Sequence, residues 1–165
     1  METVFDPPPA PVNSLAKAPL SSYRQRLTEP TGYQLDEQIG YLLRRATQRH
    51  LAIFAAAISE VTTTQFAVLA RLAEAGPMSQ NQLGRATSMD AATIKGVVDR
   101  LGRLGLVATA ADPEDRRRLT VRLTAEGEEL FAACRATALQ VSADTLSPLS
   151  EAEAQLFRSL LLRLT

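Results

Sequence analysis

The chain is poor in the residues that carry redox and metal chemistry. Its 165 residues include one cysteine, one histidine and no tryptophan. A lone Cys134 cannot form a disulfide within the chain, and one histidine with one cysteine cannot supply a usual zinc ligand set. A glycine-rich phosphate loop, a serine nucleophile elbow and paired catalytic carboxylates are also missing. The sequence therefore predicts no enzyme activity, no metal and no cofactor.

Long hydrophobic runs are missing too. None approaches the roughly 20 apolar residues that a transmembrane helix needs. The amino terminus lacks the basic and then apolar pattern of a secretory signal. Together with the single cysteine, these absences predict a cytoplasmic protein with no membrane partner.

Charge is balanced overall, because 18 Lys and Arg residues match 18 Asp and Glu residues. Locally it is not. Residues 85–122 carry eight basic side chains against five acidic ones, whereas six acids face three bases in residues 123–165. The middle of the chain is thus the part expected to face nucleic-acid phosphate, although a solvated surface would have the same modest imbalance.

The hydrophobic pattern predicts a mainly helical chain. The first helix, at about 35–58, places one stripe on Leu35, Ile39, Leu43, Ala46, His50, Ile53 and Ala57. Residue pairs typical of helix starts then predict three short helices. Two of these starts are capping-box pairs, Thr62 with Gln65 and Ser79 with Gln82, and the third is Asp90 as an N-cap. The helices are expected at about 63–75, 80–87 and 91–104. The last two, joined by a very short turn, form a helix-turn-helix.

A basic β-hairpin is predicted directly after this motif. Turn formers and three arginines fill 112–118, and the alternating LTVRL follows, so strands are expected at about 105–110 and 118–123. A helix-turn-helix followed by such a hairpin is typical of a winged DNA-binding module. Two further helices are expected, one from about 124 to 145 and one from a capping box at Ser150 to about Arg163. Residues 1–30 hold most of the prolines and lack periodicity, which favours a flexible arm.

The candidate recognition helix exposes small and polar residues opposite its apolar stripe. Small side chains let the backbone approach base edges, and Thr and Lys offer hydrogen bonds. An ordinary surface helix would have a similar face. The helix start at 79 can also contact phosphate, besides simple capping. The candidate DNA contacts are Ser79, Gln80, Ala91, Ala92, Thr93, Lys95, Arg100, Arg116, Arg117 and Arg118.

Among the hairpin arginines, Arg117 is the one predicted to enter the minor groove, where the potential is most negative. Asp115 lies two residues earlier and can brace its guanidinium, so that less side-chain entropy is lost on binding. Arg116 and Arg118 are expected to contact phosphate. A solubilising loop is the alternative.

The only histidine, His50, lies on the apolar stripe of the first helix beside Arg49, with Arg44 and Arg45 one turn earlier. A lone histidine on such a face is often a core residue. The other interpretation is an anion pocket, in which an arginine binds a carboxylate and His50 binds a ring substituent. Cys134, between alanines, is expected to be a buried small hydrophobe.

The stretches TTTQFAVLARLAEAGPMSQNQLGRATSMDAATIKGVVDRLGRLGLV and DPEDRRRLTVRLTAEG resemble the MarR family of winged-helix regulators over about residues 32–164. The resemblance implies a homodimer that binds a pseudo-palindromic operator, usually as a repressor. It also implies that Asp115 and Arg117 match the family's wing brace and minor-groove arginine.

The stretch DEQIGYLLRRATQRH is similar to a subgroup that senses small aromatic acids, including nicotinate-pathway repressors that respond to 6-hydroxynicotinate. In that subgroup the ligand binds between the dimerisation helices and the winged module. The resemblance implies that the ligand-binding residues are Arg44, Arg45, Arg49 and His50.

The sequence thus predicts a mainly α fold with a small β-wing, in which a winged helix-turn-helix module joins a helical dimerisation region. The expected parts are an arm at 1–30, a dimerisation region at 31–60 and 124–165, and a DNA-binding domain at 61–123. The expected function is a dimeric repressor released from its operator by a small aromatic carboxylate. A constitutive DNA-binding or architectural protein without a ligand is the alternative.

Replacing Arg117 with alanine tests the wing. Loss of a minor-groove cation is expected to weaken operator binding and to lower the slope of log affinity against log salt by about 1. Fluorescence anisotropy across a salt series measures both quantities. Unchanged operator binding would remove Arg117 from the interface.

Overall fold

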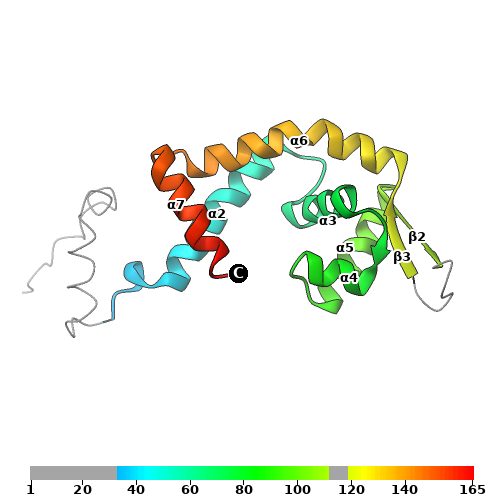
Figure 1. Cartoon of the computed structure of the whole chain (residues 1–165), viewed down its shortest axis with the longest axis horizontal. Helices are drawn as coiled ribbons and strands as arrows, with labels where there is room; N and C mark the ends of the chain where they lie inside the picture. Colours follow the sequence, from blue (N-terminus) through cyan, green and yellow to red (C-terminus); the bar gives the residue numbers. More distant parts are fainter. Residues whose placement is uncertain (1–32, 112–118) are drawn as a thin grey trace, which may run out of the picture. The chain divides into compact units, whose positions relative to one another are not determined.

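The computed structural model describes residues 33–111 and 119–165, and these form helices with one small antiparallel sheet (Figure 1). A short 3₁₀ turn comes first. The elements are η2 (Leu35–Glu37), α2 (Ile39–Ala57), α3 (Thr63–Ala75), β1 (Met78–Ser79), α4 (Gln80–Ala86), α5 (Ala91–Arg103), β2 (Val107–Ala111), β3 (Leu119–Leu123), α6 (Ala125–Leu146) and α7 (Glu151–Leu162). The mainly α fold with a small sheet is as predicted. No helix among the described residues is long and apolar enough to cross a membrane.

The chain divides into two compact units between Leu42 and Leu43, within α2. The described part of the first unit comprises η2 and the first turn of α2. Gln38 Nε2 donates to the Gln34 carbonyl over 2.9 Å, and the side chains of Leu35 and Ile39 are exposed. The second unit contains every other element.

The predicted helix starts are confirmed. Thr62 accepts from the Gln65 backbone N–H over 3.3 Å, and the Gln65 side chain accepts from the Thr62 N–H over 2.8 Å. The same reciprocal pair forms at Ser79 with Gln82 and at Ser150 with Glu153. Each box satisfies two backbone N–H groups that a helix start would otherwise leave unpaired.

The sheet has three strands in the order β1-β3-β2, all antiparallel. The hairpin of β2 and β3 confirms the predicted wing strands, with Thr109 opposite Val121. The sequence did not predict β1, because a two-residue strand is too short to show alternation. Met78 and Ser79 pair with Val121 and Thr120 and so attach the start of α4 to the wing.

One core lies under α3, α4, α5 and the sheet. Its fully buried large side chains are Val68, Leu69, Leu83, Ile94, Val97, Leu101 and Val121, with Val141 from α6. In α2 the buried side chain is Phe54, and Ile58, the residue that follows the helix, is buried as well. Leu35, Ile39, Leu43, Ala46 and Ala57 of the predicted apolar stripe are exposed in the single chain, and His50 and Ile53 are half-buried.

The start of α6 is hydrogen-bonded to, and packed against, the turn that precedes β2. The Thr124 hydroxyl donates to the Gly105 carbonyl over 2.6 Å, and the Thr124 N–H donates to the Leu106 carbonyl over 3.2 Å. Gly127 is buried against the same Leu106 carbonyl, and a Cβ atom at position 127 would collide with it. The close approach requires glycine at this position.

Replacing Gly127 with alanine is therefore expected to lower the free energy of unfolding by about 1–3 kcal/mol, through overpacking against backbone. Gly102, where a Cβ would meet nothing closer than 4.0 Å, is the matched helical control. Urea unfolding at fixed protein concentration measures both variants. Equal stability of the two variants would contradict the close approach.

Candidate DNA interface and ligand cavity

Helix α5 has the two faces that the sequence predicts. Ile94, Val97, Val98 and Leu101 are buried against the module. The opposite face is exposed, and it carries the candidate contacts Ala91, Ala92, Thr93, Lys95 and Arg100. A continuous exposed face on the second helix of a helix-turn-helix is the geometry that enters a major groove.

Polar groups on this face are partly arranged by the helix itself. Asp90 accepts from the Thr93 backbone N–H over 2.7 Å and from the Thr93 hydroxyl over 3.0 Å, and these bonds lower the pKa of the Asp90 carboxyl. The hydroxyl proton of Thr93 is thereby used, so its methyl group and lone pairs are what remain for DNA. Lys95 forms an ion pair with Asp99 at 2.7 Å, on an exposed surface.

The Arg100 guanidinium lies back over Gly96, where a Cβ atom would be 3.6 Å from one of its terminal nitrogens, an ordinary contact distance. An arginine placed there can extend toward DNA without displacing packed residues.

The remaining candidate contacts are at the start of α4 and in the wing. Ser79 caps α4, and its hydroxyl donates to Gln82 Oε1 over 2.8 Å. Ser79 and Gln80 are both half-buried. Asp115, Arg116, Arg117 and Arg118 lie outside the described residues. The assignment of these residues to DNA stays a prediction.

A cavity of about 620 Å³ lies between α2, α3 and α6. Its walls include a row of rings contributed by all three helices. The ring centroids of His50 and Phe54 are 6.4 Å apart, those of Phe54 and Phe66 5.8 Å, and those of Phe66 and Phe131 5.6 Å. Such spacing is typical of packed aromatic pairs.

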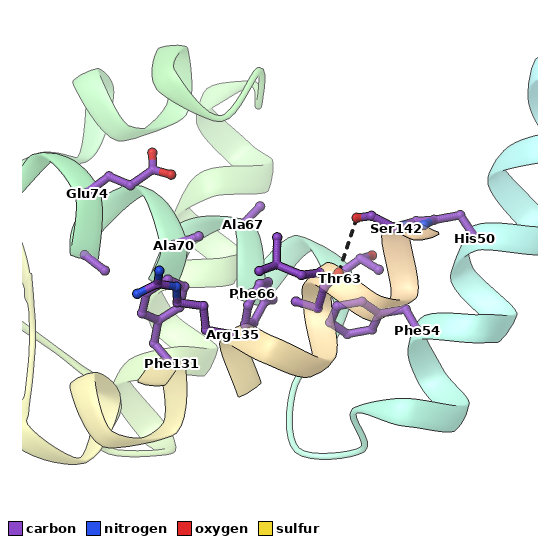
Figure 2. Close-up of a pocket in the computed structure, with 13 residues that line it drawn as sticks. His50, Phe54, Thr63, Phe66, Ala67, Ala70, Glu74, Phe131, Arg135 and Ser142 are labelled. Atoms are coloured by element: carbon purple, nitrogen blue, oxygen red, sulfur yellow. Dashed lines mark hydrogen bonds between the residues drawn. The ribbon is translucent and has the colours of Figure 1, made fainter. Parts of the chain in front are cut away.

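The cavity is polar at both ends. Figure 2 shows His50 and Ser142 at one end, and Glu74, Arg135 and Phe131 toward the other. Glu74 is paired with Arg71 at 3.1 Å, which offsets its charge. Arg135 forms no ion pair within the described residues, so a cation remains for a ligand at that end.

Of the four predicted ligand-binding residues, the structure places one in the cavity wall and three outside it. His50 lines the cavity. Arg49 does not, because its guanidinium donates to the carbonyls of Asp144 and Thr145 and to the Ser147 hydroxyl, over 3.0, 3.2 and 3.2 Å. Arg44 and Arg45 are exposed on α2 and are not among the lining residues. A ligand-binding role for these three arginines stays a prediction.

Of the residues that line the cavity, the sequence predicted only His50, and among those it missed Arg135 is the basic one. A signal existed, because Phe131, Arg135, Ala138 and Ser142 recur at helical spacing and all line the cavity from α6. An arginine on a partly apolar helical face is common on surfaces, so spacing alone does not separate it from its neighbours.

Cys134 is buried in α6, as expected for a small hydrophobe. Burial raises the pKa of its thiol, and the charge of Glu60 raises it further. The thiolate is the reactive form of cysteine, so this environment disfavours reaction.

The comparisons with known proteins decide the family. Residues 59–118 match the MarR family model. The transcriptional repressor NicR of Pseudomonas putida is 43% identical over 125 residues, which cover 74% of this chain and 79% of that protein. The chain belongs to the MarR family. It is a DNA-binding transcriptional regulator.

Solved structures agree with this assignment. A probable transcriptional regulator from Pseudomonas aeruginosa is 51% identical with a TM-score of 0.78, and the match covers 80% of this chain and all of that one. BpsR of Bordetella bronchiseptica, whose DNA binding is regulated by 6-hydroxynicotinic acid, is 40% identical with a TM-score of 0.77. That match covers 81% of this chain and 97% of BpsR.

The ion pair between Lys95 and Asp99 allows a test of whether the exposed face of α5 contacts DNA. Asp99→Asn removes a negative charge and releases Lys95, so operator affinity is expected to rise a few-fold. Lys95→Ala is expected to weaken binding and to lower the salt slope by about 1. Anisotropy with a duplex selected in vitro from random sequences measures both. Asp99→Asn and Lys95→Ala acting in the same direction would exclude this face from the interface.

Proposed function

We propose that this protein is a dimeric repressor whose operator binding is released by a small aromatic carboxylate, such as 6-hydroxynicotinate, bound in the cavity between α2, α3 and α6. The observation that supports the ligand is the row of rings from three helices along one cavity wall. The relatives support the same reading, since NicR is a repressor and BpsR responds to 6-hydroxynicotinic acid.

The cavity suits such a ligand in size and chemistry. Its volume lies within the range of about 300–1,000 Å³ that is usual for small-molecule sites. A planar ring can pack against the row of Phe54, Phe66 and Phe131 that lines the cavity. The carboxylate and the ring hydroxyl of 6-hydroxynicotinate lie on opposite sides of the ring. We infer that the carboxylate meets Arg135 and the hydroxyl faces His50.

Helix α3 supplies a route from ligand to DNA. One face of α3, at Val68, Leu69 and Leu72, is buried in the core that supports α5. Another face, at Phe66 and Ala70, lines the cavity. A ligand that binds better when α3 sits further from α6 shifts the dimer toward the arrangement that cannot match an operator.

The parts of the chain take distinct roles in this proposal. Residues 61–123 bind DNA, and residues 31–60 and 124–165 form the dimer. Apolar residues at the carboxyl end are exposed in the single chain and would be covered by a second copy. They are Leu156, Phe157, Leu160, Leu161, Leu162 and Leu164. Such a regulator works in the cytoplasm, where the operator is.

The effector proposal predicts separable defects. His50→Ala and Arg135→Ala are each expected to keep operator affinity and to weaken 6-hydroxynicotinate binding by at least about tenfold, because each removes a polar partner of the ligand. Isothermal titration calorimetry measures ligand binding, and anisotropy measures the ligand concentration that releases the operator.

Arg44→Ala is the informative comparison, since Arg44 carries the same charge on α2 outside the cavity. Loss of the response in Arg44→Ala but not in Arg135→Ala would place the carboxylate partner on α2. Operator binding that no aromatic carboxylate changes, in the wild-type protein, would favour the constitutive DNA-binding alternative.

A further inference from the structure

The His50 ring contacts a hydroxyl group at the end of α6. His50 Nδ1 lies 3.0 Å from Thr145 Oγ1, and His50 is half-buried. The Thr145 hydroxyl in turn donates to the Val141 carbonyl over 2.7 Å. This places the only histidine of the chain in a hydrogen-bonded series that runs from the cavity into the helix backbone.

Counting protons along this series assigns the histidine tautomer. A threonine hydroxyl has one proton, and here the Val141 carbonyl receives it. Thr145 Oγ1 can then only accept from His50, so Nδ1 must carry a proton. In a neutral imidazole the other nitrogen, Nε2, is then a bare acceptor. Within the described part of the chain, Nε2 has no hydrogen-bond partner, so it remains for a ligand.

Arg49 keeps Thr145 within reach of His50. Its guanidinium donates to the carbonyls of Asp144 and Thr145, so the last turn of α6 is attached to the helix that carries His50. Adjacent residues of α2 thus act on the same turn: Arg49 fixes the backbone, and His50 bonds the side chain.

The second polar group at this end of the cavity has the same character. The Ser142 hydroxyl donates to the Ala138 carbonyl over 3.2 Å, so its oxygen offers lone pairs and no proton. Thr63 also lines this end, and its hydroxyl can donate or accept as it rotates, so it does not discriminate. The two groups with fixed hydrogen-bonding roles at this end, His50 Nε2 and Ser142 Oγ, are therefore both acceptors.

We propose that Thr145 is a positioning residue that fixes the Nδ1–H tautomer of His50, and that this tautomer selects effectors with a hydrogen-bond donor on the ring side opposite the carboxylate. The selectivity rests on the proposed effector function, whereas the tautomer does not. An effector with a ring hydroxyl or ring N–H there is bound, and one with only acceptors there is rejected, because two acceptors would face each other without a proton.

The tautomer is measured in the free protein. Untagged protein labelled with ¹⁵N-histidine gives one pair of ring nitrogen signals, because the chain has one histidine. Spectra are recorded at alkaline pH, where an imidazole is neutral. A protonated Nδ1 and a bare Nε2 are expected. Thr145→Val removes the hydroxyl at similar volume and is expected to shift the proton toward Nε2, and Thr145→Ser is expected to restore the original pattern.

Selectivity is measured by calorimetry with 6-hydroxynicotinate and 6-chloronicotinate, which differ in the donor at one position. The wild-type protein and Thr145→Ser are expected to prefer the hydroxy compound by about tenfold or more, as for one buried hydrogen bond. Thr145→Val is expected to lose most of this preference. Thr137→Val, on the same helix outside the cavity, is the matched control and is expected to keep it.

The outcomes separate the two levels of the proposal. A protonated Nε2 in the free wild-type protein overturns the tautomer. The expected tautomer with equal affinity for both compounds overturns its role in selectivity. If neither compound nor any related aromatic carboxylate binds, the proposed effector function fails and the selectivity fails with it, while the ¹⁵N spectra still decide the tautomer.

Discussion

The row of rings formed by His50, Phe54, Phe66 and Phe131 joins three helices, and the cavity depends on it. Phe66 belongs to α3, whose other face is part of the core under the recognition helix. The rings leave a cavity beside them instead of closing it. In the proposed mechanism, a ligand in that space displaces α3 and, through the shared core, changes the position of α5.

Helix α6 gives this row a fixed wall, because both of its ends are attached. At its start, Gly127 and Thr124 lie against the backbone of Leu106 and Gly105. At its end, Arg49 binds the last carbonyls. The wing, the recognition helix and the cavity are thus linked through short, packed contacts.

Local signals were enough to predict the module, and longer-range geometry was needed for the cavity. Capping boxes at Thr62 and Ser79 depend on residues three apart, so the sequence shows them directly. His50 could be singled out from the sequence because it is the only histidine and follows three arginines on one helix, and the structure places it in the cavity wall. The role of Arg49 could not be predicted, since its partners are almost a hundred residues away. Arg135 was missed for the same reason, because only folding brings α6 beside α2 and α3.

The most direct test of the central claim uses thermodynamic reciprocity. If ligand and operator favour different arrangements of α3, the affinity for 6-hydroxynicotinate must fall when the protein is bound to its operator, by the same factor by which the ligand lowers operator affinity. Calorimetric titration of the free dimer and of the operator complex measures that factor. We expect clearly weaker ligand binding in the operator complex than in the free dimer. Equal ligand affinity in both states would contradict the proposed coupling through α3.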